Sequence, residues 1–123
     1  MNIDEKINIL LIIATIQLII VLIGSVVRIK NEFSTIQISR RSRKLSALDS
    51  EGKFVQIVKL SDAYMETWPN EASFKWSKAR ALFKLEKYSE ALALFSELKE
   101  QEPSWEEDAR KYISTINSKL QKT

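Results

Sequence analysis

An uncharged apolar run near the N-terminus, from Ile7 to Val27, limits what this chain can fold into more than any other feature. The run contains no Asp, Glu, Lys or Arg and is bounded by Lys6 and Arg28. A helix rises about 1.5 Å per residue, so a helix of this length covers about 31 Å, close to the thickness of a bilayer's hydrocarbon core. We therefore expect a transmembrane helix over residues 7–27, preceded by a short flank over residues 1–6.

A cleaved signal peptide and a buried core helix are the alternatives for this run. Signal peptides have shorter apolar regions and basic N-terminal flanks, whereas here Asp4 and Glu5 accompany a single Lys6, and no small-x-small cleavage site follows. A core helix needs cover on all sides, and the rest of this small chain is too short to supply it. Both alternatives are weaker than an uncleaved anchor.

Basic residues gather directly after the apolar run, in a juxtamembrane segment over residues 28–44 that we expect to be helical. The N-terminal side carries Lys6 alone, and such an asymmetry keeps the basic side in the cytoplasm. We expect the N-terminus outside and the C-terminal part inside, most simply at the inner (plasma) membrane of a bacterium. The six basic residues are Arg28, Lys30, Arg40, Arg41, Arg43 and Lys44.

The same segment accounts for the formal net charge of +3. From Leu45 onward the chain has 12 Lys and Arg against 13 Asp and Glu. The basic character is therefore no argument for nucleic-acid binding. It suits membrane topology and contact with anionic lipid headgroups.

One polar residue, Gln17, lies near the middle of the apolar run, where an unpaired amide is costly. Small and polar residues share its helix face, and such faces let transmembrane helices approach each other. We expect this face to contact another transmembrane helix or a second copy, although a strongly apolar helix also tolerates one amide. The face consists of Ala14, Gln17, Val21, Gly24 and Ser25.

Composition predicts an all-α protein and argues against an enzyme. There are only two glycines and two prolines, and no histidine or cysteine, which removes the commonest general base and the usual zinc ligands. The acidic run from Glu106 to Asp108 is explained by the preference of carboxylates for a helix N-terminus. No nucleotide-binding or catalytic motif is present, so we expect no cofactor and no metal.

A sequence repeat is present in the second half of the chain. Pro69 and Pro103 are separated by about 34 residues, and this period is typical of helix-pair repeats. Apolar or small residues recur with the same period: Leu48 with Leu82, Phe54 with Tyr88, Ile57 with Ala91, Leu60 with Leu94, and Tyr64 with Leu98.

Residues 72–105 resemble a tetratricopeptide (TPR) repeat. The residues that carry the resemblance are Ala79, Leu82, Tyr88, Ala91, Phe95 and Pro103. A degenerate copy precedes it over about 38–69, in which Ser61 replaces a bulky aromatic residue. The family's glycine before the second helix is kept at Gly52 but is Glu86 in the second copy, which predicts a differently shaped turn there. The resemblance implies antiparallel helical hairpins over residues 45–123.

The clear repeat predicts helices over 72–85 and 89–101, with Asn70 as the cap of the first. Ser104 and Glu107 form a capping-box pattern, which predicts a last helix over about 105–120 that closes the array. Its apolar stripe consists of Ala109, Tyr112, Ile113, Ile116 and Leu120.

In the TPR family the first helix of each repeat lines a groove that binds peptides. Carried onto this chain, the groove positions are Ser73, Trp76, Arg80, Phe83 and Lys84. Trp76 is equally compatible with packing between repeats, and Phe83 more often packs than binds. Because arrays usually need about three repeats to be stable alone, we expect a partner to complete the stack.

These features leave three hypotheses for the function. The first is a membrane-anchored adaptor that holds a protein or peptide partner at the cytoplasmic face. The second is an accessory structural subunit of a membrane complex, assembled through the transmembrane helix and the TPR-like domain. The architecture is also similar to a mitochondrial import receptor with an N-terminal anchor and a small cytosolic TPR-like domain.

Overall fold

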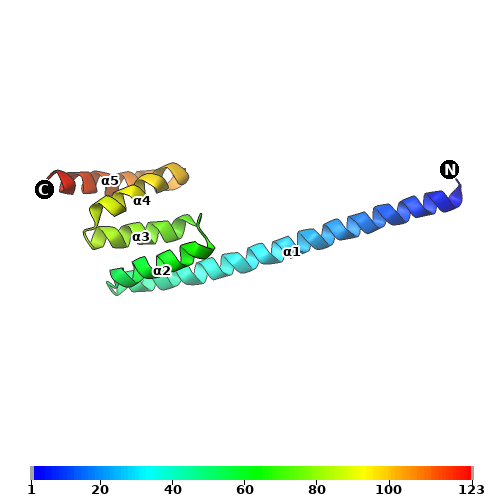
Figure 1. Ribbon diagram of the computed structural model, residues 1–123, viewed down its shortest axis with the longest axis horizontal. Coiled ribbons are helices and arrows are strands. Elements are labelled where there is room, and N and C mark those ends of the chain that lie inside the picture. Colours follow the sequence, from blue (N-terminus) through cyan, green and yellow to red (C-terminus); the bar gives the residue numbers. More distant parts are fainter. Residues whose placement is uncertain (1, 123) are drawn as a thin grey trace. The chain divides into compact units, whose positions relative to one another are not determined.

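The computed structural model describes residues 2–122, and every regular element in this part of the chain is a helix (Figure 1). The prediction of an all-α protein is confirmed. The chain divides into two compact units, residues 1–39 and 40–123.

Helix α1 (Ile3–Ser50) is a single helix of 48 residues. It contains the apolar run and the basic segment, which we predicted as helical, and it extends into the second unit. At its start the Asn2 side chain accepts a hydrogen bond from the Glu5 amide, 2.8 Å away. Along the helix, hydroxyls such as that of Thr35 donate to the carbonyl four residues earlier, so polar side chains do not interrupt it.

Within residues 3–39 the apolar part of α1 is exposed along its whole length. An 18-residue stretch has a mean hydropathy of 2.9, and none of it is buried. By length and composition, α1 is the one described helix that is able to cross a membrane.

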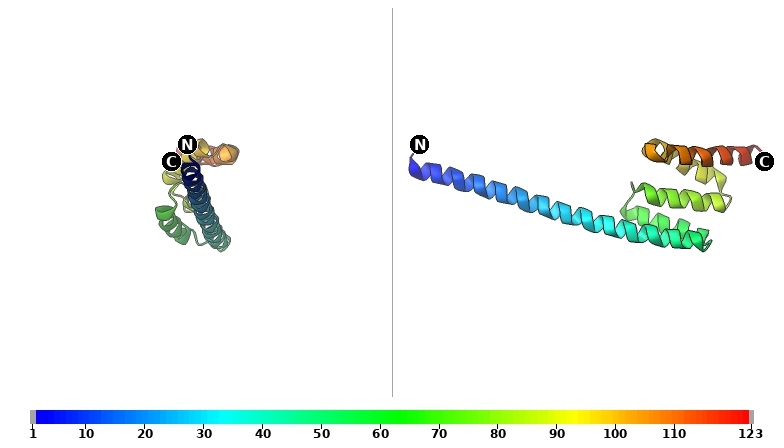
Figure 2. Two further views of the ribbon diagram at one scale, coloured as in Figure 1. Left: turned by 90° about the vertical axis from the view of Figure 1, so that its right-hand side faces the viewer. Right: turned by 180° about the vertical axis from the view of Figure 1, so that it is seen from behind.

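The second unit combines the end of α1 with four further helices and a 3₁₀ turn, connected by short turns. Successive helices pack on each other, α2 on α3, α3 on α4 and α4 on α5, as Figure 2 also shows. The elements are α2 (Phe54–Thr67), α3 (Ala72–Lys84), α4 (Tyr88–Gln101), the 3₁₀ turn η1 (Pro103–Trp105) and α5 (Glu106–Gln121).

Helix boundaries in this unit recur with the same period as the two prolines. Helices α2 and α4 both have 14 residues and begin at Phe54 and Tyr88, one period apart. Helices α1 and α3 end at Ser50 and Lys84, which have the same separation. The starts of α3 and α5, Ala72 and Glu106, repeat it once more.

The turns after α1 and α3 each contain one residue in the left-handed backbone conformation, at equivalent positions, although the two residues are of different types. Gly52 has φ 73° and Glu86 has φ 63°. The prediction of a differently shaped turn at Glu86 is therefore wrong. This conformation costs a non-glycine residue about 1–2 kcal/mol, and the surrounding turn holds Glu86 there.

Backbone hydrogen bonds explain why the second turn keeps its shape. After α3, the Glu86 amide donates to the Phe83 carbonyl at 3.0 Å and the Lys87 amide to the Leu82 carbonyl at 2.9 Å. The equivalent bonds after α1 lie one period earlier, with nearly the same lengths of 3.1 and 3.0 Å. This pair of bonds is the Schellman motif, which satisfies the last carbonyls of a helix.

Both predicted N-terminal caps are wrong. The residue before α3 is Glu71, not Asn70, and it makes no capping bond through its side chain. Ser104 lies inside η1, so α5 begins at Glu106, and the residue before it, Trp105, has no side-chain capping bond. The amides of Glu71 and Trp105 donate to carbonyls three residues earlier, so a hydrogen-bonded backbone turn precedes each of the two helices.

The core of this unit lies mainly between α3, α4 and α5. Phe95 is fully buried there, together with Leu82, Leu98 and Ile116. A second set of buried side chains comes from α1, α2 and α3: Leu45, Ile57 and Phe74. Each such side chain stabilises the fold by about 1.5–3 kcal/mol through burial.

Candidate interaction surface

The five predicted groove residues all lie on α3, but their side chains differ in what they contact. Trp76 and Phe83 make contacts with rings of α5, whereas Ser73 and Arg80 contact the end of α1. Lys84 is exposed.

Trp76 is the centre of an aromatic cluster that joins α3, α4 and α5. Its ring lies edge-on to Phe95, Trp105 and Tyr112, with centroid distances of 5.3, 5.5 and 5.7 Å. Phe83 extends the cluster, because its centroid lies 5.2 Å from that of Tyr112. Aromatic pairs contribute about 0.5–1.5 kcal/mol beyond area burial. Both side chains are thus occupied by packing within the unit.

Arg80 forms an ion pair with Asp49 near the end of α1. The distance from Nη2 to Oδ2 is 3.3 Å, and the two side chains are 37% and 29% exposed. The Arg80 Nε atom is buried and has no hydrogen-bond partner among the described residues. A depression of about 30 Å³, lined in part by Arg80, Ser46 and Ser77, lies beside the pair and is large enough for one water molecule.

Ser73 takes part in a small polar contact at the other end of α3. Its hydroxyl lies 2.9 Å from a Glu71 carboxylate oxygen, to which it donates a hydrogen bond, and 3.4 Å from the Ser42 hydroxyl of α1. The contact links α1 to the start of α3 and leaves Ser73 without a free hydroxyl proton for a ligand.

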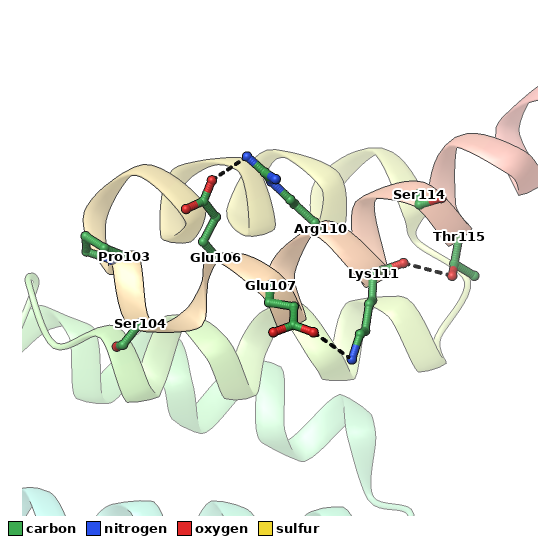
Figure 3. A pocket seen from close by; sticks show the side chains of 8 residues that line it. All are labelled: Pro103, Ser104, Glu106, Glu107, Arg110, Lys111, Ser114 and Thr115. Carbon is green, nitrogen blue, oxygen red and sulfur yellow. Dashed lines mark hydrogen bonds and ion pairs between the residues drawn. The ribbon is translucent and has the colours of Figure 1, made fainter.

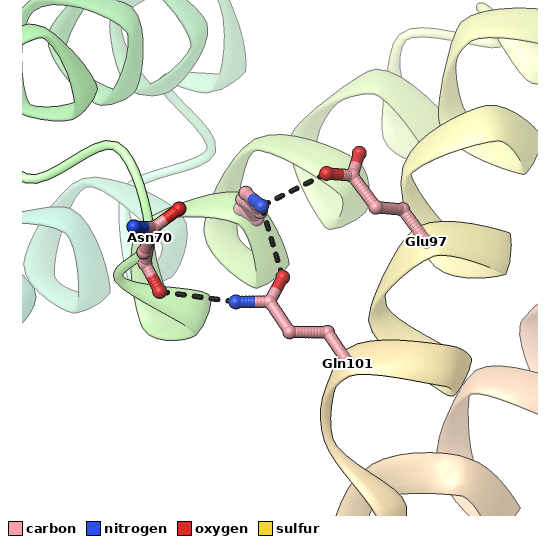
Figure 4. A network of polar contacts seen from close by, with 4 residues as sticks. Asn70, Glu97 and Gln101 are labelled. Atoms are coloured by element: carbon pink, nitrogen blue, oxygen red, sulfur yellow. Dashed lines mark hydrogen bonds and ion pairs between the residues drawn. The ribbon is translucent and has the colours of Figure 1, made fainter.

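One residue that the sequence did not single out, Lys75, links α3 to α4. Its ammonium group lies 2.9 Å from both the Glu97 carboxylate and the Gln101 amide oxygen, and its side chain is 11% exposed. The Gln101 amide nitrogen in turn donates to the carbonyl of Asn70, as Figure 4 shows. No spacing pattern marks this network, because its members come from three separate segments.

The outer face of α5 is polar and paired within itself. A shallow open depression there is lined by charged and hydroxyl side chains, including the Glu106 and Arg110 pair and the Glu107 and Lys111 pair (Figure 3). Thr115 donates to the carbonyl of Lys111. Glu106 and Glu107 at the start of α5 therefore pair with cations of their own helix, as charged side chains on solvated helix faces commonly do.

Arg41, which the sequence assigned to the membrane-proximal basic group, makes contacts inside the second unit. Its guanidinium carbon lies 4.8 Å from the Trp68 ring centroid and 5.4 Å from that of Tyr64. Tyr64 lies in the last turn of α2, and Trp68 follows the helix directly. Their spacing of four residues can be read from the sequence, but the cation that contacts both rings cannot. Arg40, Arg43 and Lys44 are exposed.

The predicted transmembrane contact face lies on the exposed apolar part of α1. Ser25 donates to the Val21 carbonyl at 2.9 Å, so its hydroxyl is satisfied within the helix. Gln17, Ala14 and Gly24 are exposed. Among the described residues no second helix of this chain covers the face, and the contact stays a prediction.

Among the described residues, no three acidic side chains are grouped so that they could hold a metal ion. The chain was compared with protein-family models, with curated proteins and with solved structures, and none of the three comparisons finds a match.

Proposed function

We propose that this protein is a membrane-anchored adaptor. The apolar part of α1 spans the membrane, and a TPR-like helical unit from residue 40 onward binds a segment of another protein and holds it at the cytoplasmic face. The observation that carries the proposal is an unburied apolar helix in the same chain as a helical unit whose helix boundaries recur with a constant period.

The absence of cover over the apolar stretch supports the membrane anchor. A core helix would be buried by its neighbours, and this stretch is 0% buried. A cleaved signal peptide is a weaker explanation, because α1 continues past Arg28 without a break. Its last turns contribute buried Leu45 and Leu48 to the second unit.

The recurrence supports the TPR-like interpretation of the second unit. It extends from sequence to helix boundaries, to the left-handed residues Gly52 and Glu86, and to the backbone bonds beside them. A period of about 34 residues in paired helices is the TPR signature among helical repeats.

For the partner contact we favour the edge of α3 that carries Arg80 and Lys84. Arg80 is 37% exposed and Lys84 is exposed, whereas Trp76 and Phe83 pack inside the unit. Arginine is among the residue types that dominate interface energetics.

Capture from membranes tests the adaptor. Tagged full-length protein should bring down a partner in mild detergent, and Arg80→Glu with Lys84→Glu should lower its yield at least fivefold. The matched control is Lys87→Glu with Lys99→Glu, which makes the same change of charge outside the proposed contact. Equal yields from both double variants would exclude this edge of α3.

Carbonate washing and protease treatment test the anchor itself. Protein retained in washed membranes, with the second unit digested only after access to the cytoplasmic side, is the expected result. Release by carbonate would remove the membrane proposal.

An accessory structural subunit is the second candidate, and two observations favour it. Trp76 and Phe83 are engaged in packing rather than open to a ligand, and Gln17 places an amide in the apolar stretch. Replacing residues 7–27 with an unrelated apolar helix separates the two candidates. An adaptor should keep its partner after the exchange, whereas a subunit assembled through the Gln17 face should lose it.

A further inference from the structure

A second apolar face lies on α1 beyond the apolar run. Ile29, Phe33 and Ile36 are 65%, 62% and 52% exposed. They are four and three residues apart, so at about 100° per residue they form one stripe on the helix. The residues between them are mostly polar: Lys30, Asn31, Glu32, Ser34 and Thr35. An exposed apolar stripe on an otherwise polar helix is typical of a surface that packs on another element.

The spacing of the stripe is that of a coiled coil. Alternating steps of four and three residues put apolar side chains at the two inward positions of a heptad. The same steps continue backward to Val26 and Leu22, so the face runs without interruption into the apolar run.

The charges on this face define where a symmetric contact ends, and before that point they are compatible with a second copy of the chain as its occupant. The next two positions after Ile36 are Arg40 and Arg43, both exposed, and in a symmetric pair each would face its own copy and repel it. Before that point no like charges meet. In parallel heptad register Lys30 faces Ser25 of the second copy, and Glu32 faces Gln37 of the second copy.

Lipid is a poorer occupant, and this step rests on the proposed membrane anchor. At about 1.5 Å per residue, Phe33 and Ile36 lie about 9 and about 13 Å beyond Val27 along the helix. Acyl chains end near the basic residues that follow Val27, so they do not cover Phe33 and Ile36. An anchor in one orientation also keeps two copies parallel, as the heptad register requires.

We propose that the protein forms a parallel homodimer in which Ile29, Phe33 and Ile36 of α1 pack against the same residues of a second copy. Gln17 lies about 120° around the helix from Ile29, so the dimer leaves Gln17 itself available to a different helix. Ser25, at the edge of the predicted Gln17 face, lies within the dimer contact instead.

Single-cysteine scanning tests this pairing cleanly, because the chain has no cysteine of its own. Full-length variants with one cysteine at each of positions 28–38 are oxidised in membranes, and the disulfide-linked dimer is measured. We expect maxima at 29, 33 and 36, at least fivefold above Asn31→Cys, Ser34→Cys and Thr35→Cys. A flat profile, maxima on another face or no dimer would overturn the proposal.

The same samples distinguish failure of the dimer from failure of the anchor. Protein that resists carbonate extraction but gives no periodic cross-linking overturns the dimer alone. Protein that carbonate releases overturns the anchor, and the cross-linking profile of the released protein still decides the pairing.

A packing variant provides an independent check. Phe33→Ser with Ile36→Ser should raise the dissociation constant of the detergent-solubilised dimer at least tenfold by light scattering. The matched control, Asn31→Ser with Thr35→Ser on the polar side of the helix, should leave it unchanged. An equal effect of both double variants would contradict a contact through the stripe.

Discussion

Two residues of the second unit, Glu86 and Ser61, occupy positions that ordinarily favour other residue types. Glu86 has φ 63°, a backbone conformation that glycine adopts at little cost. Ser61 is fully buried in α2, and its hydroxyl has no partner among the described residues. Its counterpart one period later, Phe95, is one of the largest buried side chains. Both positions therefore reduce the stability of the unit, and each is open to a simple test.

Glu86→Gly should stabilise the protein by about 0.5–1 kcal/mol. Relief of the left-handed strain contributes about 1–2 kcal/mol, and the greater freedom of glycine in the unfolded chain offsets part of it. Denaturant titration followed by circular dichroism measures the change.

The complementary variant is Gly52→Ala, which should destabilise the protein by about 1 kcal/mol. A Cβ added at Gly52 meets nothing within 4 Å, so its cost comes from the backbone alone. Stabilisation by Gly52→Ala would contradict the assigned conformation of these turns.

Ser61→Ala should raise stability by about 1 kcal/mol or more, because it removes a buried hydroxyl that lacks a partner among the described residues. For a unit of this size that corresponds to an increase in Tm of about 4–8 °C.

Ser96→Ala is the matched control, since Ser96 is exposed on α4 and reports the helix propensity of alanine without a burial change. If the two variants shift Tm equally, the Ser61 hydroxyl is satisfied in solution.

At the scale of elements, α5 owes its position to aromatic packing rather than to its N-terminal cap. Tyr112 stacks on Phe95 with ring centroids 4.4 Å apart and contacts Trp76 and Phe83 edge-on. The outer face of the same helix carries polar and charged pairs around its surface depression. The inner face of α5 therefore determines where the helix lies.

Tyr112→Ala should destabilise the unit by about 3–5 kcal/mol, the usual cost of truncating a large packed aromatic side chain. Tryptophan fluorescence should change as well, because the rings of Trp76 and Tyr112 are in contact. Lys111→Ala, one position away on the exposed face, should stay within about 0.5 kcal/mol of the parent protein. Equal effects of the two variants would mean that the cluster does not hold α5.

Sequence patterns located the helices well and their ends less well. The helix predicted over 72–85 is α3, one residue shorter, and the helix predicted over 89–101 begins one residue earlier as α4. Periodicity is summed over many residues, so it survives local exceptions. Caps depend on single side chains, and at Ser104 the turn that begins with Pro103 took precedence.

The candidate site was less predictable, because its contacts join distant segments. The positions of Trp76 and Arg80 on one helix followed from periodicity, but their partners Tyr112 and Asp49 lie on helices that only the tertiary structure brings together. The Lys75 network and the stacking of Arg41 were missed for the same reason.

At the scale of the whole molecule, the recurrence of helix boundaries makes the second unit extendable. Helices α3 and α5 begin one period apart, and the amides of Glu71 and Trp105 make equivalent hydrogen bonds to carbonyls three residues earlier. The two residues differ in ψ, which is 107° at Glu71 and 3° at Trp105. A tandem duplication of residues 72–105, inserted between Trp105 and Glu106, would keep the period of the helices at both joints. The longer array should gain helical content in proportion and melt at a higher temperature, because each added interface adds to the stability of a linear stack. This chain would then serve as a starting point for building membrane-tethered arrays of chosen length.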